Sequence, residues 1–186
     1  MGEVVKRVNA VWFSPTGTTQ KTVEAVAASI CKNMGGDTEY KSTSFTLAGE
    51  REKNLKFNEE DIVVFGVPVY AGRVPNILLK YLNTVTGGRS QVVPVVVYGN
   101  RNYDDALIEL KGIMEDRNFR VVAAGAFIGE HSFSKILAKD RPDALDMEIA
   151  ESFGAKISSE IKFRNSKGCI DLEDKFEDRK EPELFF

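Results

Sequence analysis

The 186-residue chain is long enough for one domain with a sizeable core, and 42% hydrophobic with 28% charged residues is typical of a soluble globular protein. A net charge of −3 argues against a nucleic-acid-binding protein, which would carry a basic surface. No apolar run approaches the ~18–20 residues that span a bilayer, and the first residues lack a signal-peptide pattern, so we expect a cytoplasmic protein.

The cysteine and histidine content argues against most metal sites. Two distant cysteines, Cys31 and Cys169, cannot hold an iron–sulfur cluster. Cys31 falls on the apolar face of a predicted helix, and Cys169 lies in a polar segment with no disulfide partner in view. The single histidine, His131, argues against zinc catalysis. No metal role is therefore expected.

Strand and helix patterns alternate from the start of the chain. A near-continuous apolar run predicts a buried strand over about 4–13. Apolar residues three and four apart predict a helix over 18–34, with Gly35 placed to end it. Residues 38–46 alternate weakly and predict an edge strand, whereas 47–60 fit either a short helix or a loop.

Three further buried strands are predicted over 61–67, 92–98 and 121–128. A final helix over 142–163 is expected to have Pro142 in its first turn. The three helices of this half are expected to bury apolar faces, made of Val74, Ile77, Leu78, Tyr81, Leu82 and Val85; of Ala106, Leu107, Leu110, Ile113 and Met114; and of Leu145, Ile149, Phe153, Ile157 and Ile161.

This alternation predicts an α/β fold, a doubly wound five-stranded parallel sheet with helices on both faces. Residues 1–163 form the predicted domain, and the charge-rich residues 164–186 are expected to be a tail. In such sheets the ligand lies beyond the carboxyl ends of the strands, where the strand order reverses. The loops that follow the strands are therefore the candidate site.

The first of these loops has the composition of a phosphate cradle. It lies at a helix N-terminus, where unpaired N–H groups and the helix dipole favour an anion. Gly17 lets the backbone approach a ligand closely, and the hydroxyl donors come from Ser14, Thr16, Thr18 and Thr19. The competing interpretation is ordinary capping of the helix by these side chains.

The absence of two nucleotide-binding sequence patterns narrows the class of phosphate ligand. The triphosphate pattern GxxxxGK[ST] fails because Lys21 lies four residues past Gly17 and the first glycine is absent, and GxGxxG is absent as well. Hydroxyls without a cation suit a single phosphate monoester, whose charge many hydrogen bonds can stabilise. Flavin mononucleotide (FMN) is the commonest such cofactor on this kind of fold.

A second loop, 68–75, follows the strand at 61–67 and contains two prolines and a glycine. Tyr70 can cover one face of a flat ring, and the backbone at Ala71 and Gly72 can meet the ring edge. The competing interpretation is that Tyr70 completes the core with its hydroxyl in water.

A third loop, 98–105, offers aromatic groups for the other ring face. Tyr98 and Tyr103 are the candidates, and Gly99 and Asn100 present backbone groups. Tyrosines in both loops beside a phosphate cradle favour a flavin site over simple packing.

These segments resemble the flavodoxin family. The stretch Ser14–Thr19 is similar to the family's [ST]-x-T-G-x-T phosphate loop, and Gly66–Pro75 and Tyr98–Tyr103 resemble a bacterial subgroup in which a flavodoxin domain is fused to a ferredoxin domain. The resemblance covers about 4–163, including Gly129–Ser132 and Asp140–Asp143, and implies the strand order 2-1-3-4-5. The chain ends where the cysteine-rich ferredoxin would begin, so an iron–sulfur partner is expected to be a separate protein.

The resemblance implies an electron carrier that binds FMN and exchanges single electrons with redox partners. It assigns the phosphate to Ser14, Thr16, Gly17, Thr18 and Thr19, and the ring to Pro68, Val69, Tyr70, Ala71, Gly72, Arg73, Tyr98, Gly99, Asn100, Arg101, Tyr103 and Asp104. A carbonyl at Ala71–Gly72 turned toward the ring N5, stacked tyrosines, and the carboxylates of Asp104, Asp105 and Glu130 are expected to tune the potential.

Three alternatives follow from the same residues. An FMN-dependent NAD(P)H or quinone reductase would need one open ring face, with Glu130 and His131 available for a proton. Arg73 and Arg101 would then receive an acidic partner or a phosphorylated substrate such as a pyridine nucleotide, or lie in solvent. A receiver domain is rejected because no Asp stands at the central strand end, where Pro68 lies; a flavin-free domain stays open.

Overall fold

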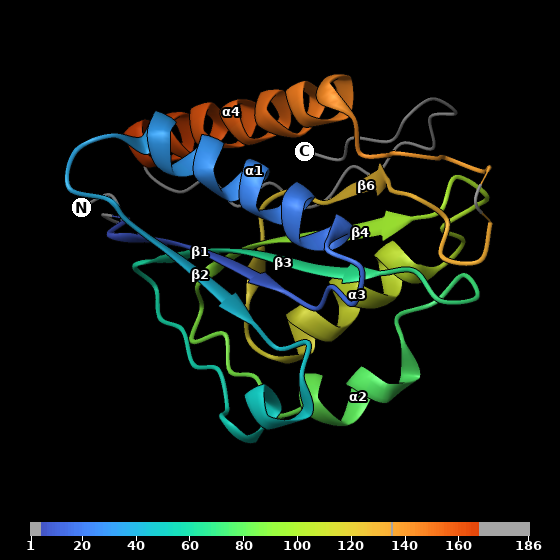
Figure 1. The fold of residues 1–186 in the computed structure, drawn as a ribbon. Helices are drawn as coiled ribbons and strands as arrows, with labels where there is room; N and C mark the ends of the chain where they lie inside the picture. The colour runs from blue at the N-terminus through green and yellow to red at the C-terminus, as the bar shows by residue number, and fades with distance from the viewer. Residues whose placement is uncertain (1–4, 135, 168–186) are drawn as a thin grey trace.

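The computed structural model describes residues 5–134 and 136–167, and within them the elements alternate as the sequence predicts (Figure 1). Cys169 and the predicted tail beyond residue 167 lie outside the described residues. The elements are β1 (Arg7–Trp12), α1 (Thr18–Met34), β2 (Glu39–Ser44), the 3₁₀ helix η1 (Ala48–Glu52), β3 (Asp61–Pro68), α2 (Asn76–Leu82), β4 (Gln91–Tyr98), α3 (Ala106–Asp116), β5 (Arg120–Val121), β6 (Gly125–Ile128) and α4 (Ala144–Lys167).

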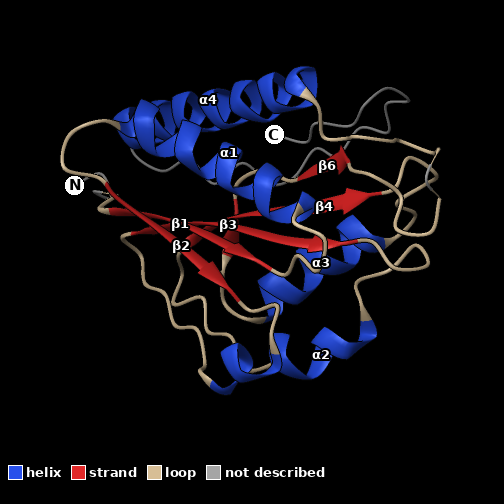
Figure 2. Cartoon of the chain, in the orientation of Figure 1, coloured by secondary structure: helices blue, strands red, loops and turns tan. Residues whose placement is uncertain are grey.

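All paired strands run parallel in the order β2-β1-β3-β4-β5, with β6 also paired to β4, which confirms the predicted doubly wound sheet. Helices α1 and α4 cover one face, and α2 and α3 cover the other (Figure 2). None of the helices within the described part of the chain is long and apolar enough to cross a membrane.

The predicted strand over 121–128 is interrupted. Val121 pairs with Val92 and Gly125 pairs with Val95, so between these pairs the outer strand has one more residue than β4. An extra residue of this kind is a bulge, which breaks the regular ladder. Pro94 lies at this level of β4 and has no N–H to donate, which favours a break here.

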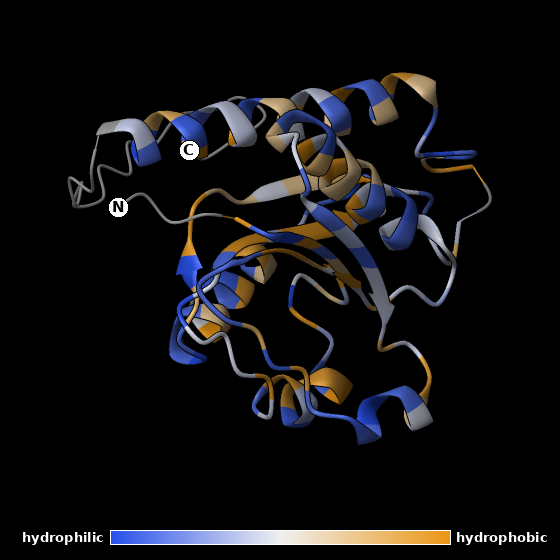
Figure 3. Cartoon of the chain, turned by 90° about the vertical axis from the view of Figure 1, so that its left-hand side faces the viewer, coloured by the Kyte–Doolittle hydropathy of each residue, from blue (hydrophilic) through white to orange (hydrophobic). Residues whose placement is uncertain are grey.

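Each face of the sheet has its own core, and β3 contributes to both. Ile62 and Val64 pack with α1 and α4, whereas Val63, Phe65 and Val67 pack with α2 and α3. Because side chains alternate across a strand, a strand buried on both faces is apolar at every position. The apolar residues accordingly gather in the strands at the centre of the molecule (orange in Figure 3).

Some predicted helix faces are wrong at their edges. Ile77 is 64% exposed, and Val74 and Val85 are buried outside α2, which has only two turns. In α4 the buried apolar side chains are those of Ala150, Phe153, Ile157 and Ile161. Leu145 is 62% exposed and Ile149 is 46% exposed, because Ile149 precedes the buried row by one residue and therefore points about 100° away.

The last helix begins and ends later than predicted, at Ala144 and Lys167, and Pro142 precedes it. Its start is held by a reciprocal pair of hydrogen bonds: Asp143 N–H donates to the Asp146 carboxylate at 2.8 Å, and Asp146 N–H donates to Asp143 Oδ1 at 3.0 Å. The Asp146 carboxylate also accepts two hydrogen bonds from the Arg141 guanidinium. This guanidinium holds the pKa of Asp146 below its ordinary value.

Replacing Asp146 with Ala is expected to lower the free energy of unfolding by about 2 kcal/mol at pH 7, since a cap and a charge-assisted pair are lost together. Asp146→Asn keeps an acceptor for Asp143 N–H and is expected to lose less. Urea unfolding at pH 7 and pH 3 checks both variants. Because the folded-state pKa is lowered, the stabilisation is present above the unfolded value of about 3.9 and is lost as pH falls further. If Asp146→Ala loses as much stability at pH 3 as at pH 7, the loss does not come from the ionised Asp146 carboxylate.

Candidate functional site

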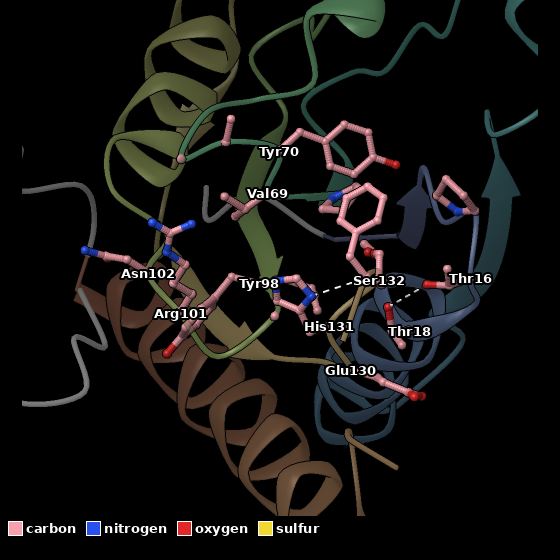
Figure 4. A pocket seen from close by; sticks show the side chains of 18 of the residues that line it. Thr16, Thr18, Val69, Tyr70, Tyr98, Arg101, Asn102, Glu130, His131 and Ser132 are labelled. Atoms are coloured by element: carbon pink, nitrogen blue, oxygen red, sulfur yellow. Dashed lines mark hydrogen bonds between the residues drawn. The ribbon is translucent and has the colours of Figure 1, made fainter. Parts of the chain in front are cut away.

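Four loops meet at the carboxyl edge of the sheet and enclose an open cavity of about 1170 Å³. They follow β1, β3, β4 and β6, so each wall comes from a different part of the chain. Figure 4 shows Thr16 and Thr18 on one side of the cavity, Tyr98 and Arg101 on the other, and Tyr70 across from His131. The lining residues are Pro15, Thr16, Thr18, Thr19, Pro68, Val69, Tyr70, Ala71, Gly72, Val97, Tyr98, Gly99, Arg101, Asn102, Asp104, Glu130, His131, Ser132 and Phe133.

The loop after β1 brings hydroxyls to the N-terminus of α1. Thr16 Oγ1 and Thr18 Oγ1 lie 3.2 Å apart, and both side chains line the cavity. The N–H groups of Thr18 and Thr19, in the first turn, have no carbonyl of their own helix to bond. This end of the cavity therefore offers neutral donors suited to an anion.

Ser14 lies apart from these donors. Its side chain is buried, and Ser14 Oγ accepts the N–H of Gln20 at 3.0 Å, which caps the helix from inside. Neither Ser14 nor Gly17 lines the cavity. The capping interpretation thus describes Ser14, whereas Thr16, Thr18 and Thr19 face the cavity.

The loop after β3 forms a tight hairpin. Tyr70 and Arg73 exchange two backbone hydrogen bonds, each of 3.0 Å, across Ala71 and Gly72. Both central residues have positive φ, 50° for Ala71 and 76° for Gly72, as in the mirror-image turns that suit hairpins. At Gly72 a Cβ would also collide with the Asp104 side chain, so the hairpin tip can meet the next loop only without a side chain there.

Helix α3 holds this hairpin from below through Glu109. Its carboxylate accepts Arg73 Nε at 3.0 Å, Arg73 Nη2 at 2.9 Å and the N–H of Val74 at 2.8 Å. The Arg73 guanidinium is the main reason that the pKa of Glu109 lies below its ordinary value. Arg73 does not line the cavity, and its guanidinium, on a side chain that is 59% exposed, is paired with Glu109.

The two tyrosines of the loop after β4 lie in different environments. Their rings lie 5.3 Å apart, but Tyr98 lines the cavity and Tyr103 packs against the core beneath α2 and α3. Asn100 is exposed and does not line the cavity, whereas Gly99 does. A Cβ at Gly99 would lie 2.8 Å from His131 Cδ2, so this glycine lets the loops after β4 and β6 touch.

The loop after β6 forms the fourth wall, whose residues are not among the flavin contacts expected from the sequence, although Glu130 is expected to tune the potential. Glu130, His131, Ser132 and Phe133 all line the cavity, and Phe133 is 97% exposed at its mouth. The loop's place in the sequence could have identified it as part of the site, because Gly129–Ser132 follows a strand and so lies at the same sheet edge as the other loops. Within residues 5–134 and 136–167, no group of three or more His, Cys, Asp or Glu side chains could hold a metal ion.

Comparison with solved structures places the fold. An archaeal flavodoxin has a TM-score of 0.58 at 16% identity, covering 84% of this chain and 99% of its own. Oxidised flavodoxin 1 from Bacillus cereus has a TM-score of 0.57 at 16% identity, over 82% of this chain and 97% of its own. Rubredoxin oxygen:oxidoreductase from Desulfovibrio gigas has a TM-score of 0.59 at 14% identity, over 88% of this chain but 38% of its own.

No protein-family model and no curated protein matches the sequence. The structural likeness therefore establishes a flavodoxin-like fold, which agrees with the resemblance of the loop motifs.

Proposed function

We propose that the chain binds FMN and acts as an electron-transfer protein for separate redox partners, such as an iron–sulfur protein. The observation that carries the proposal is a set of neutral donors at one end of a cavity that Tyr70 and Tyr98 also line, from two other loops. Among the described lining residues the only Lys or Arg is Arg101, on the loop after β4. This arrangement suits a ligand with one phosphate and a flat ring.

The residues fit FMN in kind and in order. Thr16, Thr18 and the first N–H groups of α1 would hold the phosphate. Tyr70 and Tyr98 would contact the ring, and backbone groups of Gly72 and Gly99, which also line the cavity, would meet its edge. When bound, the flavin would supply reversible one-electron chemistry.

The charges around the cavity would set the energy of added electrons. Asp104 and Glu130 both line the cavity, so their carboxylates oppose negative charge on a bound ring. Asp105 does not line it and precedes α3. We therefore propose that two carboxylates, and not the three that we expected, tune the flavin potential.

A reductase is the second candidate, and the size of the cavity favours it. About 1170 Å³ exceeds the roughly 300–1,000 Å³ typical of pockets for one drug-sized ligand. A nicotinamide or quinone ring could lie beside the flavin, where Glu130 and His131 line the wall. Either group could then exchange a proton with the substrate.

Anaerobic titration of the purified protein reconstituted with FMN distinguishes the candidates. Tight binding with two resolved one-electron steps is the expected result for a carrier. Direct two-electron bleaching by NAD(P)H alone would instead favour the reductase. A protein that binds no FMN overturns both.

A further inference from the structure

The His131 side chain organises the loop after β6. His131 Nδ1 accepts two backbone hydrogen bonds, from the N–H of Phe133 and from the N–H of Ser134, each at 3.1 Å. A nitrogen can accept only when it carries no proton, so this turn requires the neutral imidazole with its hydrogen on Nε2. A proton on Nδ1 would turn the shared acceptor into a donor that faces two other donors.

The turn is tied to the later part of its own loop and contacts the loop after β4. Glu130 N–H donates to Arg141 O at 2.9 Å, and His131 N–H donates to Leu137 O at 3.3 Å. The imidazole also packs on Gly99 of the loop after β4, which lines the same cavity. Loss of the two Nδ1 hydrogen bonds would therefore disturb the wall formed by His131, Ser132 and Phe133.

We propose that His131 is a pH-sensitive latch for the flavin site: the neutral imidazole keeps the wall formed and FMN bound, and the protonated imidazole releases the wall and weakens binding. The inference rests on the proposed FMN function. His131 acts here as a positioning residue, because it shapes the loop that meets the ligand. Acidification should loosen the cofactor, and FMN binding should expel a proton from the imidazole.

Other charged groups near His131 do not account for a transition between pH 6 and 8. Among the described residues of its own loop they are Glu130, Lys139, Asp140, Arg141 and Asp143, and on the loop after β4 Arg101 and Asp104 line the same cavity. Carboxyl, ammonium and guanidinium groups ordinarily titrate outside this interval. The FMN phosphate does titrate near pH 6, so riboflavin, which has no phosphate, is the better probe.

The test measures the Kd for riboflavin, by quenching of its fluorescence, at pH 6 and pH 8, both above the sequence pI of 5.4. We expect wild type to bind more weakly at pH 6 than at pH 8. His131→Asn places an amide oxygen where Nδ1 lies and should bind equally well at both values, because this oxygen accepts at any pH. His131→Ala has no acceptor and should bind weakly at both.

Nuclear magnetic resonance of the flavin-free protein provides an independent readout. The chain has a single histidine, so its ring signals need no assignment, and the Phe133 and Ser134 amide signals should shift with its titration in wild type but not in His131→Asn. Identical pH profiles for wild type and His131→Asn, in Kd and in amide shifts, overturn the latch. If no variant binds either riboflavin or FMN at pH 8, the proposed function fails, and the amide shifts alone decide the latch.

Discussion

Replacement of Thr16 and Thr18 together by valine is expected to weaken FMN binding by a factor of about 100 or more. Each hydroxyl lines the end of the cavity that we assign to the phosphate, and each can donate to a charged oxygen. Hydrogen bonds to charged groups contribute about 1.5–3 kcal/mol, so two of them correspond to at least two orders of magnitude in Kd. Valine preserves the shape of threonine, so the change removes the donors and little else.

Riboflavin is the matched ligand for this experiment, because it carries the ring without the phosphate. The double variant should bind riboflavin as wild type does, and its circular dichroism should be unchanged. The hydrogen bond that Thr22 Oγ1 donates to the main-chain carbonyl of Thr18 is kept in the variant, because it does not use the Thr18 side chain. An equal loss of affinity for both ligands would mean that the threonines shape the ring site or the fold instead of binding phosphate.

Replacement of Gly154 by Ala is expected to destabilise the fold by about 2–3 kcal/mol. Helix propensity alone predicts the opposite sign, a gain of about 1 kcal/mol. The reason is contact between α4 and α1: a Cβ at Gly154 would lie 2.5 Å from the Val26 carbonyl oxygen and 2.8 Å from Ser29 Cβ. The Val26 carbonyl is backbone, so relief requires a shift between the two helices, and the hydrogen bond from Ser29 Oγ to Glu151 O would be strained with it.

Gly112 in α3 is the matched control. A Cβ there would meet nothing within 4 Å, so Gly112→Ala should show the propensity gain of about 1 kcal/mol alone. Urea unfolding compares the stability of the two variants, whose glycines both lie inside helices but differ in how closely a neighbouring helix packs on them. Equal shifts of the unfolding midpoint in both would contradict a close helix–helix contact at Gly154.

The fold could be predicted from the sequence because its signals are local. Runs such as Ile62–Val67 and the three- and four-residue spacing in 18–34 are periodic patterns that report burial directly. The exposed positions of Ile77 and Ile149 show the limit of that reasoning, since a helix face one residue off the buried row has nearly the same spacing. The bulge after β5 lies at the level of Pro94 in another strand, β4, so no pattern within 121–128 records it.

The candidate site was predictable as a set of loops and less so residue by residue. Strand ends converge at one edge of a parallel sheet, so the loops at 14–19, 68–73 and 98–104 could be grouped in advance. The direction of a loop side chain depends on tertiary partners. Tyr103 turns to the core, Ser14 turns to its helix, and Arg73 turns to Glu109, 36 residues away in sequence.

The break between β5 and β6 also bears on how the sheet ends. An edge strand exposes unpaired N–H and C=O groups that can recruit a strand from another molecule. On this side the outer ladder is split into pieces of two and four residues, too short and too kinked to offer a long template. The opposite edge, β2, carries the charges of Glu39 and Lys41. Both borders of the sheet thus discourage edge-to-edge aggregation.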